Sequence, residues 1–289
     1  MNRIEARFRS LAEEGRAGFV AYLMAGDPDP EASLAALKML PAAGADFIEL
    51  GFPFSDPMAE GPPIQRASAR ALAAGTTLER TLGIARRFRE ADPKTPLILM
   101  GYLNPILAFG IESLAREARA SGVDALIVVD CPFEEAGELE GALAAEDLFL
   151  IRLIAPTTGR DRLARLAEGA AGFFYVVSVA GVTGDKEADI AAVRSAVAEI
   201  RRVSTLPVAV GFGVRTPERA AEVARIAEAV VVGTALVEAG AADHAKSASA
   251  SKRDHPLNLV ETARSLAEAV HGARSSSAPD LVRSGHGAR

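Results

Sequence analysis

A single carboxylate stands inside one of the apolar segments of this sequence. Glu49 lies in FIELG (47–51), between Ile48 and Leu50. A carboxyl group there is either buried or directed into the end of a sheet, where loss of water would raise its pKa and let it donate and accept protons near neutral pH. A salt-bridged glutamate with a structural role is the alternative, which position alone leaves open.

The loop that follows, residues 51–63, carries two further carboxylates, Asp56 and Glu60. Its prolines and glycines are typical of a structured active-site loop, and the proline pair at 62–63 predicts the start of a helix. Glu60 would then offer a second carboxylate for acid and base chemistry. The alternative is a solvated loop glutamate, which is the usual state of such a residue.

Three glycine-containing turns predict phosphate binding: AGVTG (180–184), GFGV (211–214) and GT (233–234). Glycine lets backbone N–H groups approach an anion closely, and the last turn leads into a short helix whose amino end favours negative charge. The sequence therefore favours a phosphorylated substrate over the alternative that these segments are tight turns alone.

Other kinds of catalysis are disfavoured by composition. All four histidines follow residue 240, and the one cysteine is Cys131. Histidine acid catalysis, serine or cysteine triads and histidine or cysteine metal sites are therefore not expected in the body of the protein. None of the five lysines falls in a predicted strand, which disfavours a Schiff-base aldolase, and the carboxylates form no dense oxygen cage for a metal ion.

Eight short apolar segments predict the strands that position these groups. They are apolar at consecutive positions, as strands buried on both faces of a parallel sheet require, and helical patterns lie between them. They predict an α/β fold, a (β/α)8 TIM barrel with an N-terminal extra helix, whose active face is formed by the loops after the strands. The predicted strands are Phe19–Met24, Phe47–Leu50, Leu97–Met100, Ala125–Val129, Phe149–Ile154, Phe173–Val177, Val208–Val210 and Val230–Val232.

The chain divides by pattern into four parts. Residues 1–240 are expected to form the barrel, and residues 241–257, rich in small and polar side chains, a linker. Residues 258–271 predict an amphipathic helix packed on the barrel, and residues 272–289 a disordered tail.

Charge and hydropathy limit the partners. The formal charge of -6 and the scattered arginines give no basic footprint for a nucleic acid, and no apolar run is long enough to span a membrane. No signal-peptide core is present at the start, and the single cysteine agrees with a reducing compartment, so we expect a cytoplasmic protein.

The segment ADFIELGFPFSDPMAEGPPIQRA (45–67) resembles the signature of the tryptophan synthase alpha family, close to GADxIELGxPFSDPxADGPxIQ. The motifs GDP (26–28), MGYLNP (100–105), DxPxEE (130–135) and SxAGVTG (178–184) and the GFGV turn occur in the order of the family. The resemblance extends from about residue 4 to Leu236.

The resemblance implies a retro-aldol cleavage of indole-3-glycerol phosphate to indole and glyceraldehyde 3-phosphate. Glu49 would be the main acid and base, Glu60 would accept the indole N–H, Tyr175 would lie beside Glu49, and Thr183 would close a mobile loop over the site. The residues that match the phosphate turns are Gly184, Gly213, Gly233 and Thr234; those that match the indole pocket are Tyr22, Met100, Ile127 and Phe212.

The resemblance also implies a partner, a beta subunit that receives indole through a tunnel and joins it to serine. Asp56, Asn104 and Pro132 lie in loops that would face it, in a heterotetramer of two alpha and two beta chains. The cofactor, pyridoxal phosphate, would belong to the beta subunit, so we expect no cofactor and no metal in this chain.

Departures from the family pattern leave alternatives. Glu60 replaces the usual aspartate, Val179 stands where many members carry arginine, and the region after residue 240 exceeds the usual length. The chain would then be a stand-alone lyase that releases indole without a partner, or a catalytically weak subunit that mainly activates one. The PFSDP segment argues against a third alternative, a phosphosugar isomerase or epimerase on the same barrel.

Overall fold

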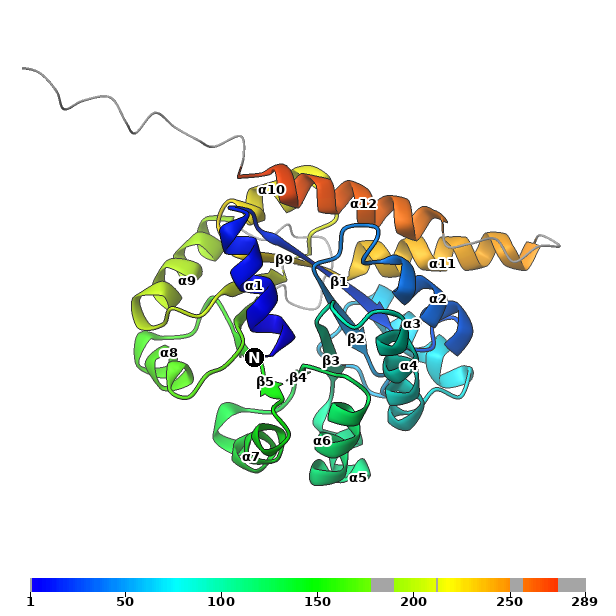
Figure 1. Cartoon of the computed structure of the whole chain (residues 1–289), viewed down its shortest axis with the longest axis horizontal. Helices are drawn as coiled ribbons and strands as arrows, with labels where there is room; N and C mark the ends of the chain where they lie inside the picture. Colours follow the sequence, from blue (N-terminus) through cyan, green and yellow to red (C-terminus); the bar gives the residue numbers. More distant parts are fainter. Residues whose placement is uncertain (1, 178–189, 212, 250–256, 275–289) are drawn as a thin grey trace, which may run out of the picture.

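The computed structural model describes residues 2–177, 190–211, 213–249 and 257–274. Within them, nine parallel strands form one sheet that helices surround in chain order (Figure 1). The strands are β1 Gly18–Met24, β2 Phe47–Gly51, β3 Leu97–Gly101, β4 Ala125–Val128, β5 Phe149–Leu150, β6 Arg152–Ile154, β7 Phe174–Val177, β8 Val208–Gly211 and β9 Ala229–Val232. The helices are α1 Arg3–Glu13, α2 Pro30–Met39, α3 Pro62–Ala73, α4 Leu78–Ala91, α5 Leu103–Phe109, α6 Ile111–Ala120, the 3-10 turn η1 Phe133–Glu135, α7 Gly137–Ala145, α8 Arg160–Ala167, α9 Ile190–Val203, α10 Pro217–Ala224, α11 Thr234–Ser249 and α12 Leu257–Gly272.

The sheet closes into a barrel because its two end strands are consecutive in the chain. Its order is β5-β4-β3-β2-β1-β9-β8-β7-β6, and the two end strands are the halves of one predicted strand. Between them, Ile151 donates its N–H to the carbonyl of Leu126 at 2.9 Å. The predicted (β/α)8 barrel is therefore confirmed, with its fifth strand divided in two.

The N-terminal helix α1 closes the amino-terminal end of the barrel (Figure 1). Asn2 caps the helix by accepting the Ile4 N–H at 2.9 Å. Inside the barrel, the Phe8 ring contacts those of Phe47 and Phe173, with centroids 4.6 and 5.6 Å apart. The predicted extra helix is thus confirmed, and it gives the site at the opposite end a packed floor.

Asp46, directly before β2, is a buried carboxylate with a full set of partners. Its oxygens accept two N–H groups of Arg16 and the N–H of Phe19, each at 2.9 Å, and one lies 2.8 Å from Nε2 of His271. Although burial opposes ionisation, the hydrogen bonds from His271 and Arg16 hold the pKa of Asp46 below its usual value. This carboxylate therefore joins α12 to the barrel and is held in its charged form.

We expect Asp46→Asn to lower the free energy of unfolding by about 3 kcal/mol at pH 7, because it removes the buried carboxylate that binds Arg16 and leaves that guanidinium with the more exposed Glu14 as its charge partner. The folded-state pKa is lowered, so this stabilisation is present above the usual pKa of 3.8 and is lost as the pH falls through the folded-state value. Urea unfolding at pH 7 and pH 3 measures the effect. The control is Glu31→Gln, which breaks the exposed ion pair with Arg87 and should change stability little; equal losses in both variants would contradict the prediction.

The end of the chain differs from the prediction. Residues 241–249, expected to be a linker, form the second half of α11, because an alanine-rich segment favours a helix even where it buries little. Asp243 in this part of α11 accepts the N–H groups of Asn258 and Leu259 at 3.1 and 3.0 Å and so caps α12. The linker prediction is wrong for these residues.

Helix α12 contacts α10 and α11 and covers nearly the residues predicted for the C-terminal helix. The packing continues past it, since Arg274 donates to the carbonyls of Ala224 and Ala227 at 3.0 and 2.6 Å. The predicted start of the tail at residue 272 is therefore wrong, since Gly272 ends α12 and Arg274 is bonded to the barrel. The rest of that tail and the remaining linker residues, 250–256, lie outside the described residues.

Candidate active site

Glu49 points into the barrel from β2, where its Cα is level with Tyr22 of β1 and Ile98 of β3. Side chains alternate along a strand, and Phe47, two residues earlier, belongs to the apolar interior. Glu49 is fully buried, and within the described chain neither of its carboxyl oxygens has a hydrogen-bond partner. Burial, with the charge of Glu60 as the smaller cause, raises the pKa of Glu49 from 4.5 to about 8.

Two buried carboxylates three residues apart thus differ in kind. Asp46 is held ionised by hydrogen bonds from His271, Arg16 and the N–H of Phe19, whereas Glu49 is buried without such partners among the described residues and keeps its proton at neutral pH. A carboxyl group with a pKa near 8 can act as an acid and then as a base under physiological conditions. In the part of the chain that the structure describes, the salt-bridged alternative for Glu49 is not seen.

The loop between β2 and α3 places Glu60 beside the mouth of the barrel. Phe54 is fixed to α3 through Ser68, whose Oγ accepts its N–H at 3.0 Å and donates to its carbonyl at 2.8 Å. Gln65 Nε2 donates to the carbonyl of Glu60 at 2.9 Å. Burial raises the pKa of Glu60 to about 7, and its charge acts on Glu49, so the two carboxyl groups form one interacting pair.

Tyr102, which follows β3, is a site residue that the sequence reasoning missed. Its hydroxyl oxygen accepts the N–H of Ala59 at 3.0 Å, one residue before Glu60, and its ring lies 5.2 Å from that of Phe54. Burial, and next the charge of Glu60, raise the pKa of Tyr102 to about 12. Its place directly after a strand, in MGYLNP, was the only signal in the sequence.

The structure places Tyr22 and Tyr175 around the carboxyl pair. Both side chains are buried, and burial raises both pKa values; the largest charge effect comes from Glu60 for Tyr22 and from Glu49 for Tyr175. Glycines make room for them, since a Cβ on Gly51 would lie 2.3 Å from the hydroxyl oxygen of Tyr22. The charge of Glu49 therefore acts on Tyr175, the residue that the family resemblance predicts beside it.

Apolar side chains form the rest of the interior wall. Ile127 is fully buried, and Met100 packs against two interior clusters, one that contains Tyr175 and one that contains Tyr22. Phe212 lies outside the described residues. Val129, two residues after Ile127, and Leu153, level with Tyr175, also face inward and were missed, although the alternation of the strands pointed to Val129. The wall suits a flat apolar ring.

Two of the predicted phosphate turns follow neighbouring strands. Gly213, after β8, has φ +60 and open space where a side chain would stand. Gly233 follows β9, and Thr234 is the first residue of the 16-residue α11, so backbone N–H groups at a helix start face this corner of the mouth. Thr183 and Gly184 lie outside the described residues. The arrangement suits an anionic group on one side of the mouth.

The three predicted partner contacts are exposed on successive parts of the same rim. Asp56 follows β2 and Pro132 follows β4, whereas Asn104 lies in the first turn of α5 rather than in a loop. Met58 and Leu107, 75% and 57% exposed, lie on the same two elements as Asp56 and Asn104. The rim therefore offers an exposed face of mixed apolar and polar residues.

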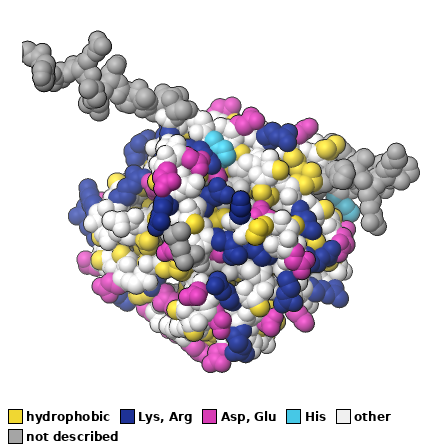
Figure 2. Space-filling model, viewed as in Figure 1, with side chains coloured by type: hydrophobic (Ala, Val, Ile, Leu, Met, Phe, Trp, Pro, Cys, Tyr) yellow, Lys and Arg dark blue, Asp and Glu magenta, His cyan; other side chains and the backbone are white. Residues whose placement is uncertain are grey.

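Charges on the face that carries α1 are mixed, with Lys and Arg interspersed among Asp and Glu (Figure 2). Among the described residues, no three His, Cys, Asp or Glu side chains are grouped to hold a metal ion, and no helix has the length and apolar character needed to cross a bilayer.

Comparisons with known proteins agree with this geometry. The family described as tryptophan synthase alpha chain matches residues 8–270. The tryptophan synthase alpha chain of Phenylobacterium zucineum is 59% identical, over 95% of this chain and 97% of its own length. That of Caulobacter vibrioides is 56% identical, over 94% and 98%. The crystal structure of tryptophan synthase subunit alpha from Legionella pneumophila superposes with a TM-score of 0.85 at 38% identity, covering 93% of this chain and 98% of its own.

Proposed function

The chain belongs to the tryptophan synthase alpha chain family, and we propose that it splits indole-3-glycerol phosphate into indole and glyceraldehyde 3-phosphate. The observation that carries this function is Glu49: a buried carboxyl group that has no hydrogen-bond partner in the described part of the chain, at the mouth of a closed barrel and coupled to Glu60. The reaction is a carbon–carbon lyase reaction that needs one group to give a proton and take one back.

In the first step, Glu49 acts as an acid. With a pKa of about 8 it carries its proton at neutral pH, and it transfers that proton to the indole carbon that bears the glycerol chain. Positive charge then develops on the ring, and the carboxylate of Glu60 accepts the indole N–H and stabilises that charge. The two raised pKa values suit one protonated and one ionised group.

In the second step, the ionised Glu49 takes the proton of the side-chain hydroxyl next to the ring. The carbon–carbon bond to the ring breaks, its electron pair restores the indole, and the hydroxyl carbon becomes the aldehyde of glyceraldehyde 3-phosphate. Glu49 regains its proton, so the cycle closes without a further reactant. Tyr175, buried beside Glu49, helps to keep this space free of water.

The phosphate is held opposite the carboxyl pair by the turns after β8 and β9. Gly213, Gly233 and Thr234 supply backbone N–H groups, and Gly184, which is predicted to join them, lies outside the described residues. Holding the substrate at this end fixes the ring between Tyr22, Met100 and Ile127.

The partner in this proposal is a tryptophan synthase beta subunit that binds the rim around Asp56, Asn104 and Pro132. Two alpha and two beta chains assemble in the cytoplasm, and the beta subunit carries pyridoxal phosphate. The exposed Met58 and Leu107 support an interface at this rim, since apolar side chains of this size gain by being covered.

Indole release by the purified chain, alone and with an excess of beta subunit, tests the function. We expect slow release alone and strong activation by the beta subunit. Rapid release without activation would instead support the stand-alone lyase, and activation of the beta subunit without indole formation would support the weak activating subunit. Absence of indole under all conditions would overturn the lyase function.

Tyr102→Phe is expected to lower kcat for indole release by about tenfold to 10²-fold with little change in KM. The ring that packs on Phe54 stays, but the acceptor for the Ala59 N–H is lost, and Glu60 moves away from its position relative to Glu49. The pH profile of kcat is the second readout, because displacement of Glu60 should change its pKa and so shift the part of the profile near pH 7 where Glu60 titrates. A variant with unchanged kcat and profile would show that Ser68 and Gln65 hold the loop without Tyr102.

A further inference from the structure

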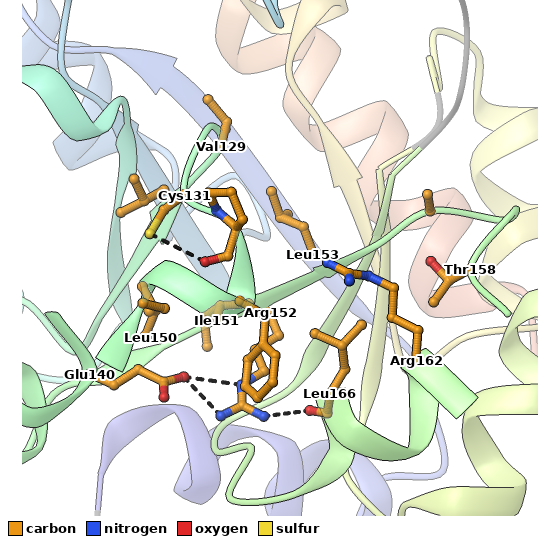
Figure 3. A pocket seen from close by; sticks show the side chains of 15 residues that line it. Val129, Cys131, Glu140, Leu150, Ile151, Arg152, Leu153, Thr158, Arg162 and Leu166 are labelled. Atoms are coloured by element: carbon orange, nitrogen blue, oxygen red, sulfur yellow. Dashed lines mark hydrogen bonds and ion pairs between the residues drawn. The ribbon is translucent and has the colours of Figure 1, made fainter. Parts of the chain in front are cut away.

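The barrel has a seam between β4 and β6. The pairing of β4 with the fifth strand ends at Leu126 and Leu150, and beyond Ile151 the strand β6 pairs with β7. A cavity of about 250 Å³ lies at this seam, between Val129 at the end of β4 and Leu153 in β6 (Figure 3). We call it the seam cavity.

Most of the side chains that line the seam cavity are apolar, and the charged side chains among them have partners. Arg152 donates to Glu140 at 2.8 and 3.1 Å (Figure 3). Its guanidinium carbon also lies 4.7 Å from the centroid of the Phe133 ring. Arg162 at the outer lip donates two hydrogen bonds to Glu134, at 2.6 and 3.0 Å. With both guanidinium groups engaged, the cavity favours an uncharged ligand over a phosphate or a carboxylate.

The seam cavity connects two regions that matter for the reaction. On the inner side, Leu153 is level with Tyr175, which lies beside Glu49. On the outer side, the seam cavity is lined by Cys131 and Pro132, which lie in the loop that the proposed partner covers. Its position is therefore between the reacting groups and the partner-facing rim.

We propose that the seam cavity is a second binding site, for one small uncharged aromatic molecule of the size of indole. An apolar cavity of about 150 Å³ holds benzene, whereas sites for larger ligands begin near about 300 Å³, so this volume suits a two-ring molecule. The flat pair of Phe133 and Arg152 is a suitable wall for such a ring. The source of the molecule rests on the proposed function, which releases indole next to Leu153.

Cys131, the only cysteine of the chain, reports on occupancy without any substitution. Its thiol is partly buried, and burial and next the charge of Asp130 raise its pKa, so a small neutral thiol reagent is used at about pH 8.5. We expect indole to slow modification of Cys131 about fivefold at about four times its dissociation constant, since only the empty site reacts. Indole-3-acetate, the same ring with a carboxylate, should give little protection.

A filling variant separates this site from the main indole pocket. Ala155→Leu narrows the seam cavity and should abolish protection by indole, with Thr158→Leu as a second filling variant if the first does not fold. The matched control, Ala164→Leu on the exposed face of α8, should keep it. Absence of protection in the wild type, or equal protection in the filling variants, would overturn the second site.

The measurement does not depend on turnover, so the two proposals fail separately. Protection of Cys131 in a chain that releases no indole from indole-3-glycerol phosphate would reject the proposed function and leave the second site standing. Normal indole release without protection would reject the second site alone.

Discussion

Glu49→Gln is expected to lower kcat for indole release by about 10²–10⁴-fold, with KM for indole-3-glycerol phosphate nearly unchanged. Glutamine has the shape of the protonated glutamate, so binding in the buried position is preserved. It can neither give a proton to the ring carbon nor take one from the hydroxyl, and both steps fail. The measurement is steady-state indole formation with saturating beta subunit.

The same substitution should stabilise the protein at alkaline pH. The folded state holds the Glu49 proton more tightly than the unfolded state, so wild-type stability falls as the pH rises from the usual value of 4.5 through about 8. Glutamine does not titrate, and the variant should become more stable than the wild type by up to about 5 kcal/mol above pH 8. Near pH 4 the two proteins should unfold almost together.

Urea unfolding at pH 4 and pH 9 checks this second effect, and Glu31→Gln is the control for loss of an exposed carboxylate. A variant that loses activity but gains no stability at pH 9 would show that Glu49 is ionised in the free enzyme. The first proton of the reaction would then have to come from another group.

The strands and Glu49 could be predicted from sequence for the same reason. Buried parallel strands are apolar at consecutive positions, and against that background one carboxylate is conspicuous. The interruption of the fifth strand at Ile151 was not visible, because a break in pairing depends on where the neighbouring strands lie and leaves the apolar pattern of the segment intact.

Contacts between distant segments explain the other misses. Tyr102 reaches the loop before Glu60 from 43 positions further along the chain, and no local pattern records such a hydrogen bond. Residues 241–249 were predicted to form a linker because their side chains are small, but alanine has a high helix propensity and the segment continues α11. The capping contact of Asp243 depends on α12, which begins beside it and is distant in sequence.

Glu60→Gln is expected to lower kcat about 10²–10³-fold, because the variant keeps the length of the side chain but loses the charge that stabilises the protonated ring. Glu60→Asp keeps the charge and shortens the side chain by one methylene, and we expect activity equal to that of the wild type or better, since the family resemblance places aspartate in this loop. Indole formation by the wild type and the two variants is measured under the same conditions. This comparison separates the effect of the charge at position 60 from the effect of side-chain length.

The structure makes this comparison decisive. The backbone around Glu60 is fixed through Ser68, Gln65 and Tyr102, which bond to the backbone of Phe54, Glu60 and Ala59, so shortening the Glu60 side chain should not release the loop. If Glu60→Asp loses as much activity as Glu60→Gln, then the fixed loop stands too far from the ring for aspartate. The longer side chain would then be a compensation for the position of the loop, and restoring activity would require moving the loop itself, for example by Tyr102→Phe in the Glu60→Asp background.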